Sequence, residues 1–405
     1  MLAGLPLPEV STLHATDARV SGAGIQREID QIAVRDDWAV HACQVLLSAA
    51  MAAGCSDLHV SCLRDEVLVR GRREGSLFDL ARISNAQRDL LIARLKVLAQ
   101  LPTFVRHEPQ DGRIEWKPAG AERPLALRAN FLPTLHGESV VIRLPEDREN
   151  VRLGFEDLGM PPDIREALGS LLSRREGVLV LTGPSSSGKT TTMYAMLERL
   201  HELHGDRLNI VSIEDPIERD LGFASQVQVN APQGLTFEKA LRAALRQDPN
   251  VLMMGEVRDA DTARTVVQAG MSGHLVITTV HAGRAVRVFT RLLSMGMEPY
   301  LVGSSLCGAM AQRLARTLCR DCRGKGCSEC SGTGSRGRIG LFEVVPVTEP
   351  LRELMLAKAP PSEIAAEASR SMTGNLQAQG RKLVSEQIIS EAEFQFLLAG
   401  EEDMP

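Results

Sequence analysis

The chain has 405 residues, 44% of them hydrophobic and 24% charged, with a formal net charge of −5. This length allows two or three domains, each with its own core. The acidic balance and an aromatic content of only 3% argue against nucleic acid as a partner. Because the sequence has neither a long apolar run nor a signal peptide at MLAGLPLPEV, we expect no membrane span and a cytoplasmic protein with reduced cysteines.

A small α/β domain is predicted over residues 37–145. The preceding residues, 1–36, mix Pro, Gly, Ser and charge without a sustained period, which predicts a flexible tail or a partner-docking segment. Apolar spacing predicts helices at 38–53 and 84–100 and strands at 58–60, 67–69, 125–132 and 139–144. A charged stretch at 145–152 begins a predicted linker, which we place at 146–160.

Strands and helices then alternate over a second predicted domain, residues 161–318. The expected order is strand 177–182, helix 190–200, strand 209–213, helix 236–246, strand 251–254, helix 260–269 and strand 275–279. Such alternation predicts an α/β fold with a parallel sheet and helices on both faces. Residues 337–405 are expected to be mainly helical, with one short strand at 339–345.

The segment GPSSSGKT at 183–190 fits the phosphate-loop pattern G-x-x-x-x-G-K-[ST] between a predicted strand and a predicted helix. Its backbone N–H groups would face phosphate at the positive end of the helix. Lys189 is expected to reach the β- and γ-phosphate oxygens of a nucleoside triphosphate and Thr190 to hold Mg²⁺. A chance match in a glycine-rich turn is the alternative. The predicted nucleotide-binding residues are Gly183, Pro184, Ser185, Ser186, Ser187, Gly188, Lys189, Thr190, Thr191 and, from the acidic segment described next, Glu214.

Acidic residues follow two of the later predicted strands. Glu256, in LRQDPNVLMMGEVRD at 245–259, is the candidate for activating the attacking water, and a surface acid is the alternative. The segment EDPIE at 214–218 supplies further carboxylates, of which Glu214 and Glu218 are predicted site residues. Which acid serves Mg²⁺ stays open, as does the alternative of a solvated turn.

Two histidines flank the strand in GHLVITTVH at 273–281. About 23 Å separates residues at this spacing on a strand, so only one histidine can face the γ-phosphate. His281, at the C-terminal end, is the candidate, and His274 is expected to make a structural contact.

Four cysteines form the pattern C-x2-C-x4-C-x2-C within residues 319–336: Cys319, Cys322, Cys327 and Cys330. Four thiolates on two tight turns can surround Zn²⁺ tetrahedrally, which predicts a zinc-binding insertion; a disulfide is the alternative. The other cysteines are expected to be buried apolar residues: Cys43, Cys55, Cys62 and Cys307.

Together these motifs resemble the hexameric ATPases of type II secretion and type IV pilus assembly. The resemblance rests on GPSSSGKTTT, IEDPIE, DPNVLMMGEVRD and GHLVITTVHA in that order, on GRIGLFE after the cysteines, and on SDLHV, PQDGRI and LRANFLPTLHGESVVIRL upstream. It implies a RecA-like P-loop ATPase domain, a smaller PAS-like N-terminal domain, and a homohexamer that uses ATP and Mg²⁺ to power secretion or pilus assembly. Platform proteins would hold it at the inner membrane.

The resemblance also identifies Arg128 and Arg143 as arginines that reach phosphate, with Arg113 a weaker candidate. Without it, each of them is typical of a solvated sheet face. The cysteine element favours an assembly or secretion motor over a retraction motor.

Two departures from the family favour other functions. Ser186 stands where the family commonly has glycine, which would strain the turn if that position needs a positive φ. Residues 1–36 are also too few for the separate docking domain of many members. The alternatives are a nucleotide-dependent scaffold or switch with slow turnover, and a DNA-uptake or translocation relative, which the acidic charge disfavours.

Overall fold

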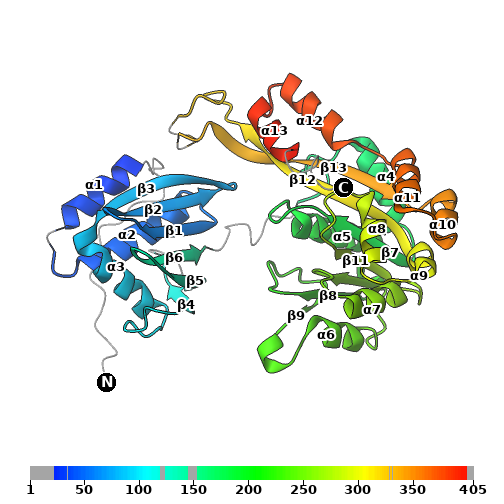
Figure 1. Ribbon diagram of the computed structural model, residues 1–405, viewed down its shortest axis with the longest axis horizontal. Helices are drawn as coiled ribbons and strands as arrows, with labels where there is room; N and C mark the ends of the chain where they lie inside the picture. Colours follow the sequence, from blue (N-terminus) through cyan, green and yellow to red (C-terminus); the bar gives the residue numbers. More distant parts are fainter. Residues whose placement is uncertain are drawn as a thin grey trace. The chain divides into compact units, whose positions relative to one another are not determined.

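The computed structural model describes residues 22–33, 35–118, 124–144, 153–327, 329–330 and 332–398. The chain divides into two compact units, one of residues 1–148 with 319–336 and the other of residues 149–318 with 337–405 (Figure 1). None of the helices described in these ranges is both long and apolar enough to cross a membrane.

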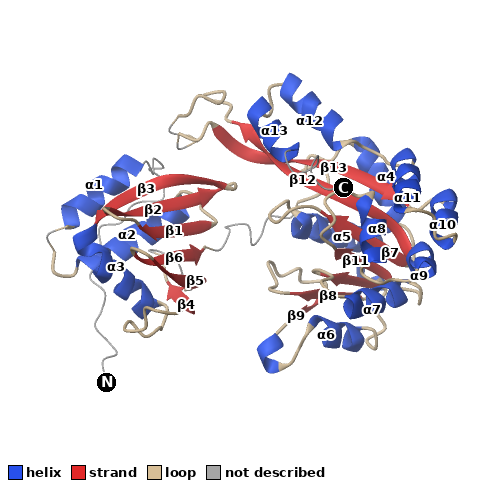
Figure 2. Ribbon diagram, in the orientation of Figure 1, coloured by secondary structure: helices blue, strands red, loops and turns tan. Residues whose placement is uncertain are grey.

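The N-terminal unit contains a six-stranded antiparallel sheet in the order β3-β2-β1-β6-β5-β4 (Figure 2). Along β6, Val140 and Ile142 are buried in the core that also holds helix residues such as Leu46, whereas Arg143 is exposed. The opposite face of this part of the sheet, the polar face, carries Arg128, Asn130 and Arg143 together with the half-buried Val141. The elements are α1 (Gly22–Ile32), α2 (Trp38–Ala52), β1 (Asp57–Cys62), β2 (Glu66–Arg73), β3 (Ser76–Ser84), α3 (Asn85–Leu98), β4 (Gln110–Trp116), β5 (Leu125–Thr134) and β6 (Gly137–Arg143).

Helix α1 corrects the prediction of a flexible tail over residues 1–36. Ile25 and Ile29 lie one helical turn apart and are only 5% and 2% exposed, because they pack into the same core as α2. Ile25, Ile29 and Ile32 recur at helical spacing, but three apolar residues in so short a segment were too weak a pattern to predict a helix. Residues 1–21 of the predicted tail lie outside the described residues.

The second unit contains a seven-stranded sheet in the order β13-β12-β7-β11-β10-β8-β9 (Figure 2). The pairings from β12 through β9 are all parallel, which confirms the predicted α/β fold. Its strands are β7 (Gly177–Thr182), β8 (Ile210–Glu214), β9 (Ser225–Gln228), β10 (Val251–Met254), β11 (Leu275–Thr279), β12 (Leu306–Leu318) and β13 (Ser335–Pro346). Its α-helices are α4 (Pro162–Leu172), α5 (Lys189–His204), α6 (Phe237–Ala244), α7 (Ala260–Gly270), α8 (Arg287–Ser294), α9 (Pro299–Ser305), α10 (Glu349–Leu356), α11 (Pro361–Arg370), α12 (Leu376–Ser385) and α13 (Glu391–Leu398).

Helices cover both faces of this sheet, as alternation of strand and helix predicts. Val178 and Val180 of β7 point into a core formed with α6 to α11, while Leu179 and Leu181 point into a core formed with α4 and α5. Both faces of the strand are buried, which explains its continuous apolar sequence.

Two further segments differ from the sequence prediction. Strand β12 was not predicted, because its alanine, leucine and arginine residues favour helix, and pairing with β7 overrides that preference. The linker expected at 146–160 is shorter, because Met160 is 4% exposed and packs into the core beside α4. The predicted linker residues 146–152 lie outside the described residues.

Candidate active site

The phosphate-loop sequence joins β7 to α5, and its first and last glycines have conformations that a side chain would not fit. Gly183 has a φ of +153°, and a Cβ there would lie 2.4 Å from the backbone oxygen of Gln312. Gly188 has a φ of +86°, and a Cβ there would lie 2.9 Å from Gln312 Nε2. Because Gly188 is also the N-cap of α5, it offers no side chain to occupy the first N–H groups of the helix. These groups remain available to an anion.

Ser186 has a φ of +60°, so the position where the family commonly has glycine does need a left-handed backbone. An L-residue in this region carries a penalty of about 1–2 kcal/mol. The strain expected from the sequence is therefore present in the loop.

The side chains of Lys189 and Ser187 fit a phosphate-binding role. Lys189 Nζ donates to the carbonyl oxygens of Gly183 and Pro184, at 2.9 Å each. Burial lowers the pKa of Lys189, while Glu256 raises it and Arg313 lowers it further. Ser187 Oγ is buried and has no hydrogen-bond partner among the described residues, which is unfavourable unless a ligand supplies one.

The other loop residues differ in how far they are exposed to solvent. Pro184, Ser185 and Ser186 are exposed, whereas Thr190 and Thr191 are half-buried in the first turn of α5. The hydroxyl of Thr190 is of the kind that holds Mg²⁺ in phosphate loops, and its role stays a prediction.

Glu256 follows β10, where the sequence predicted a carboxylate close to the loop. Its Oε2 lies 3.7 Å from Nε2 of His281, and its other oxygen accepts a hydrogen bond from Arg258. The ion pair with Glu256 raises the pKa of Arg258. The C-terminal ends of β10 and β11 thus bring Glu256 and His281 together. Glu256 is also close enough to Lys189 for its negative charge to raise the pKa of the ammonium group.

His274 lies at the opposite end of β11, and its Nδ1 is 3.0 Å from the carbonyl oxygen of Ala269. This contact agrees with the structural role expected for His274.

Within the acidic segment 214–218, Glu214 and Glu218 have different environments. Glu214 is 3% exposed, and its oxygens accept hydrogen bonds from Tyr194, Ser212 and Gln226. Glu218 is exposed, and its backbone N–H donates a hydrogen bond to Tyr194 Oη at 3.2 Å. The network gives Glu214 a structural role, and its predicted contact with nucleotide stays a prediction.

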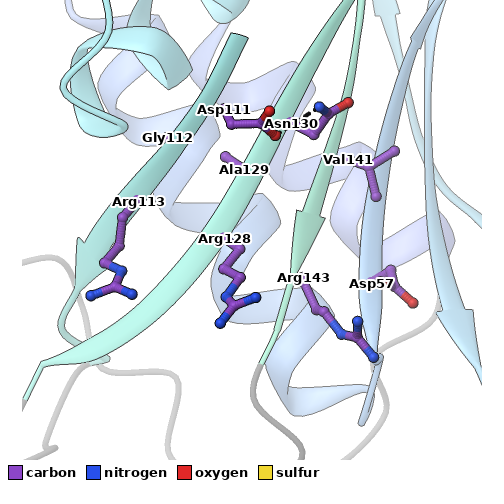
Figure 3. A pocket seen from close by; sticks show the side chains of 9 residues that line it. All are labelled: Asp57, Asp111, Gly112, Arg113, Arg128, Ala129, Asn130, Val141 and Arg143. Carbon is purple, nitrogen blue, oxygen red and sulfur yellow. Dashed lines mark hydrogen bonds between the residues drawn. The ribbon is translucent and has the colours of Figure 1, made fainter. Parts of the chain in front are cut away.

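Arginines form a row on the polar face of the N-terminal sheet. The strand register places Arg128 directly opposite both Arg113 and Arg143, and their side chains project side by side (Figure 3). Among the described residues, none of the three forms an ion pair or a side-chain hydrogen bond. They line a cavity of about 670 Å³ that Asn130 and Asp57 also line. Like charges opposite one another destabilise a sheet, although the register also places Asp57 opposite Arg143. That Arg128 and Arg143 reach phosphate stays a prediction.

The four clustered cysteines come together, although they lie on two separate turns. Their Sγ atoms all lie within 4.8 Å of one another. Backbone N–H groups point at two of the sulfurs, from Gly326 to Cys322 and from Cys327 and Gly334 to Cys330, at 3.2 Å each. This is the arrangement expected of thiolates that share one tetrahedral metal ion. The remaining cysteines are buried, as predicted, and burial raises the pKa of Cys43 to about 12.

Several residues around the site were missed from the sequence. Gln312 on β12 lies against both glycines of the loop, and its Oε1 accepts a hydrogen bond from Thr192 at 2.7 Å. Arg313 Nη2 donates to the carbonyl oxygen of Gly283, just after the histidine motif. Neither residue lies in the phosphate loop, the acidic segments or the histidine motif, and β12 itself was not predicted.

Comparisons with known proteins agree with this geometry. A model of the family described as type II/IV secretion system protein matches residues 34–396. The type II secretion system protein HxcR of Pseudomonas aeruginosa is 43% identical over 318 residues, which are 76% of this chain and 66% of the relative. The type IV pilus assembly ATPase PilB of Myxococcus xanthus is 36% identical over 387 residues, which are 88% of this chain and 68% of the relative. This chain thus spans about two thirds of the length of these relatives.

Solved structures share the fold. The Legionella pneumophila ATPase DotB matches with a TM-score of 0.68 at 21% identity, covering 88% of this chain and 95% of the DotB chain. The pilus retraction motor PilT with bound ADP matches with a TM-score of 0.61 at 22% identity, covering 89% of this chain and 98% of the PilT chain. With the family model matched over nearly the whole described sequence, the chain belongs to the type II/IV secretion system protein family.

Proposed function

We propose that this chain is an ATP-hydrolysing motor that works as a homohexamer and powers type II secretion or type IV pilus assembly. The observation that carries the proposal is the gathering of Lys189, Glu256 and His281 around the phosphate loop at the C-terminal ends of parallel strands. Ligands in such sheets bind at these ends. The names of the relatives, a type II secretion protein and a pilus assembly ATPase, support this choice of process.

Different residues of the site bind the phosphates, activate water and hold Mg²⁺. The N–H groups at the start of α5 and the ammonium of Lys189 bind phosphate oxygens. Glu256 accepts a proton from the attacking water, and His281 lies where it can orient that carboxylate or contact the γ-phosphate. Mg²⁺, which Thr190 would hold with help from Glu218 and its segment, supplies charge neutralisation for the phosphates.

Arg128 and Arg143 bind phosphate oxygens of the nucleotide in this proposal. Guanidinium groups offer paired donors that match phosphate, and these two form no ion pair among the described residues, although Asp57 lies opposite Arg143 in the strand register. The adjacent Arg113 extends the same positively charged row.

The cysteine element binds one Zn²⁺ and, we propose, contributes to the contact with platform proteins. Association with the inner membrane would then depend on these partners. Nucleic acid is not part of the proposed function, since the net charge of the chain is −5.

Ser186 favours one second candidate, a nucleotide-dependent scaffold or switch with slow turnover. Its left-handed backbone is strained, and the ion pair between Arg258 and Glu256 occupies the carboxylate that would activate water. Both features would slow hydrolysis without preventing nucleotide binding.

Steady-state phosphate release from the purified protein with ATP and Mg²⁺ tests these candidates. A motor should turn over continuously, and Glu256→Gln should abolish most of that turnover while retaining nucleotide. Nucleotide binding with negligible release would favour the switch. Strong stimulation by DNA would instead favour the DNA-translocating relative.

A further inference from the structure

Tyr194 connects the helix that follows the phosphate loop to the acidic segment 214–218. It lies on α5 and is 4% exposed. Its hydroxyl donates a hydrogen bond to Glu214 Oε2 and accepts one from the backbone N–H of Glu218 at 3.2 Å. Burial, and then the hydrogen bond to Glu214, raise the pKa of Tyr194, so the hydroxyl remains a donor at neutral pH.

Further hydrogen bonds hold the acidic segment from its other side. Glu214 Oε1 accepts hydrogen bonds from Ser212 Oγ at 2.5 Å and Gln226 Nε2 at 3.0 Å. Gln226 also bonds the carbonyl oxygen of Arg219 at 2.9 Å and the N–H of Leu221 at 2.7 Å. The backbone of the segment is thus fixed at both ends, and the acids at 215 and 218 are left exposed.

The aromatic ring and the hydroxyl of Tyr194 have separable roles. The ring packs in the core between the sheet and α5, and the guanidinium of Arg219 lies 5.4 Å from its centroid. A phenylalanine would keep both contacts. The hydroxyl adds the hydrogen bonds to Glu214 and to the backbone N–H groups of Glu218 and Arg219, and a buried hydroxyl is unfavourable unless it is bonded in this way.

We propose that Tyr194 is a positioning residue, which holds the segment 214–218 at a fixed distance from the phosphate loop so that Asp215 and Glu218 are presented to the magnesium nucleotide. This inference rests on the proposed function. It assigns Glu214 to the same structural device, since that carboxylate is the anchor to which the hydroxyl is tied.

The test is Tyr194→Phe, with Tyr300→Phe as the matched control. Tyr300 is the only other tyrosine of the chain and is 58% exposed on α9. For Tyr194→Phe we expect faster hydrogen exchange at the Glu218 amide, a fall in kcat of about tenfold or more, and a higher Mg²⁺ concentration for half-maximal activity. The KM for ATP should stay within about twofold, because Lys189 and the loop are unchanged. Tyr300→Phe should change none of these.

The outcomes separate this inference from the proposed function. Unchanged exchange at Glu218, or unchanged kcat and Mg²⁺ dependence in an active Tyr194→Phe protein, would overturn the inference and leave the ATPase intact. A wild-type protein that does not hydrolyse ATP would overturn both. If Tyr194→Phe does not fold, Glu214→Gln weakens the acceptor to which the Tyr194 hydroxyl is tied, and unchanged hydrogen exchange at the Glu218 amide with unchanged Mg²⁺ dependence in that variant would also overturn the inference.

Discussion

Replacing Ser186 by glycine should stabilise the protein, although glycine substitutions usually do the opposite. Ser186 is exposed and has a φ of +60°, so its Cβ carries the left-handed penalty of about 1–2 kcal/mol. Glycine removes that penalty but gives the unfolded chain more freedom, which costs about 0.5–1 kcal/mol. The difference between the midpoints of these two ranges predicts that Ser186→Gly raises the free energy of unfolding by about 0.5–1 kcal/mol.

Thermal unfolding measures this change directly. For a domain of roughly 150–250 residues, 1 kcal/mol shifts the midpoint by about 2–4 °C, so we expect an increase of about 1–4 °C. The matched control is Ser185→Gly, at an exposed neighbour that does not have a positive φ. There the glycine should lower stability by about 0.5–1 kcal/mol, since only the entropy term operates. Phosphate release by the same proteins shows whether relieving the strain also raises kcat.

Comparing Ser186→Gly with Ser185→Gly tests whether the left-handed backbone of Ser186 is strained. If both serine-to-glycine changes lower the midpoint by the same amount, the left-handed backbone of Ser186 does not store the strain assigned to it. An increase in both variants would contradict the reasoning equally, because Ser185 has no penalty to lose.

Four further predictions concern the site and its supports. Glu256→Gln should lower kcat by about 100-fold or more while nucleotide binding, measured by fluorescence titration, is retained, because shape is kept and the proton acceptor is lost. Arg128→Ala should lower kcat by about tenfold or more without lowering the thermal midpoint; equal turnover would assign this arginine to a solvated face. Cys319→Ser should reduce the zinc content from about one ion per chain, measured by metal analysis, and a zinc-free wild-type protein would contradict the metal site. Arg284→Ala should lower the free energy of unfolding in urea by about 3–5 kcal/mol, because Glu343 is 0% exposed and would lose its charged partner; a loss below about 1 kcal/mol would contradict this assignment.

Local sequence patterns were sufficient for the elements of the nucleotide-binding unit that carry a continuous apolar run. Strand β7 is buried on both faces, so its sequence is a continuous apolar run that predicts a strand. The loop after it needs glycine at backbone conformations that few other residues adopt, so its glycines appear in the sequence as a recognisable motif. The cysteine spacing likewise contains most of the information about the four-cysteine cluster.

Contacts between distant segments could not be predicted in this way. The bond from Tyr194 to Glu214 joins a helix to a strand end, and the pair of Arg284 and Glu343 spans 59 residues. Strand β12 exists because β7 provides a parallel neighbour, which its own residues do not indicate. Each of these depends on the tertiary fold, and a pattern within one segment contains no signal for it.

The arginine row on the N-terminal sheet implies that the stability of this domain varies with the anions around it. Each pair of directly opposed arginines lowers the free energy of unfolding by roughly 0.2–1 kcal/mol. Neutral residues that favour β-strands in place of Arg113, Arg128 and Arg143 would therefore raise it. Anions that bind the folded row, and not the unfolded chain, offset this repulsion by mass action. Buffers rich in phosphate or sulfate should therefore protect the protein from heat, and a variant selected for thermostability alone would tend to lose these arginines first.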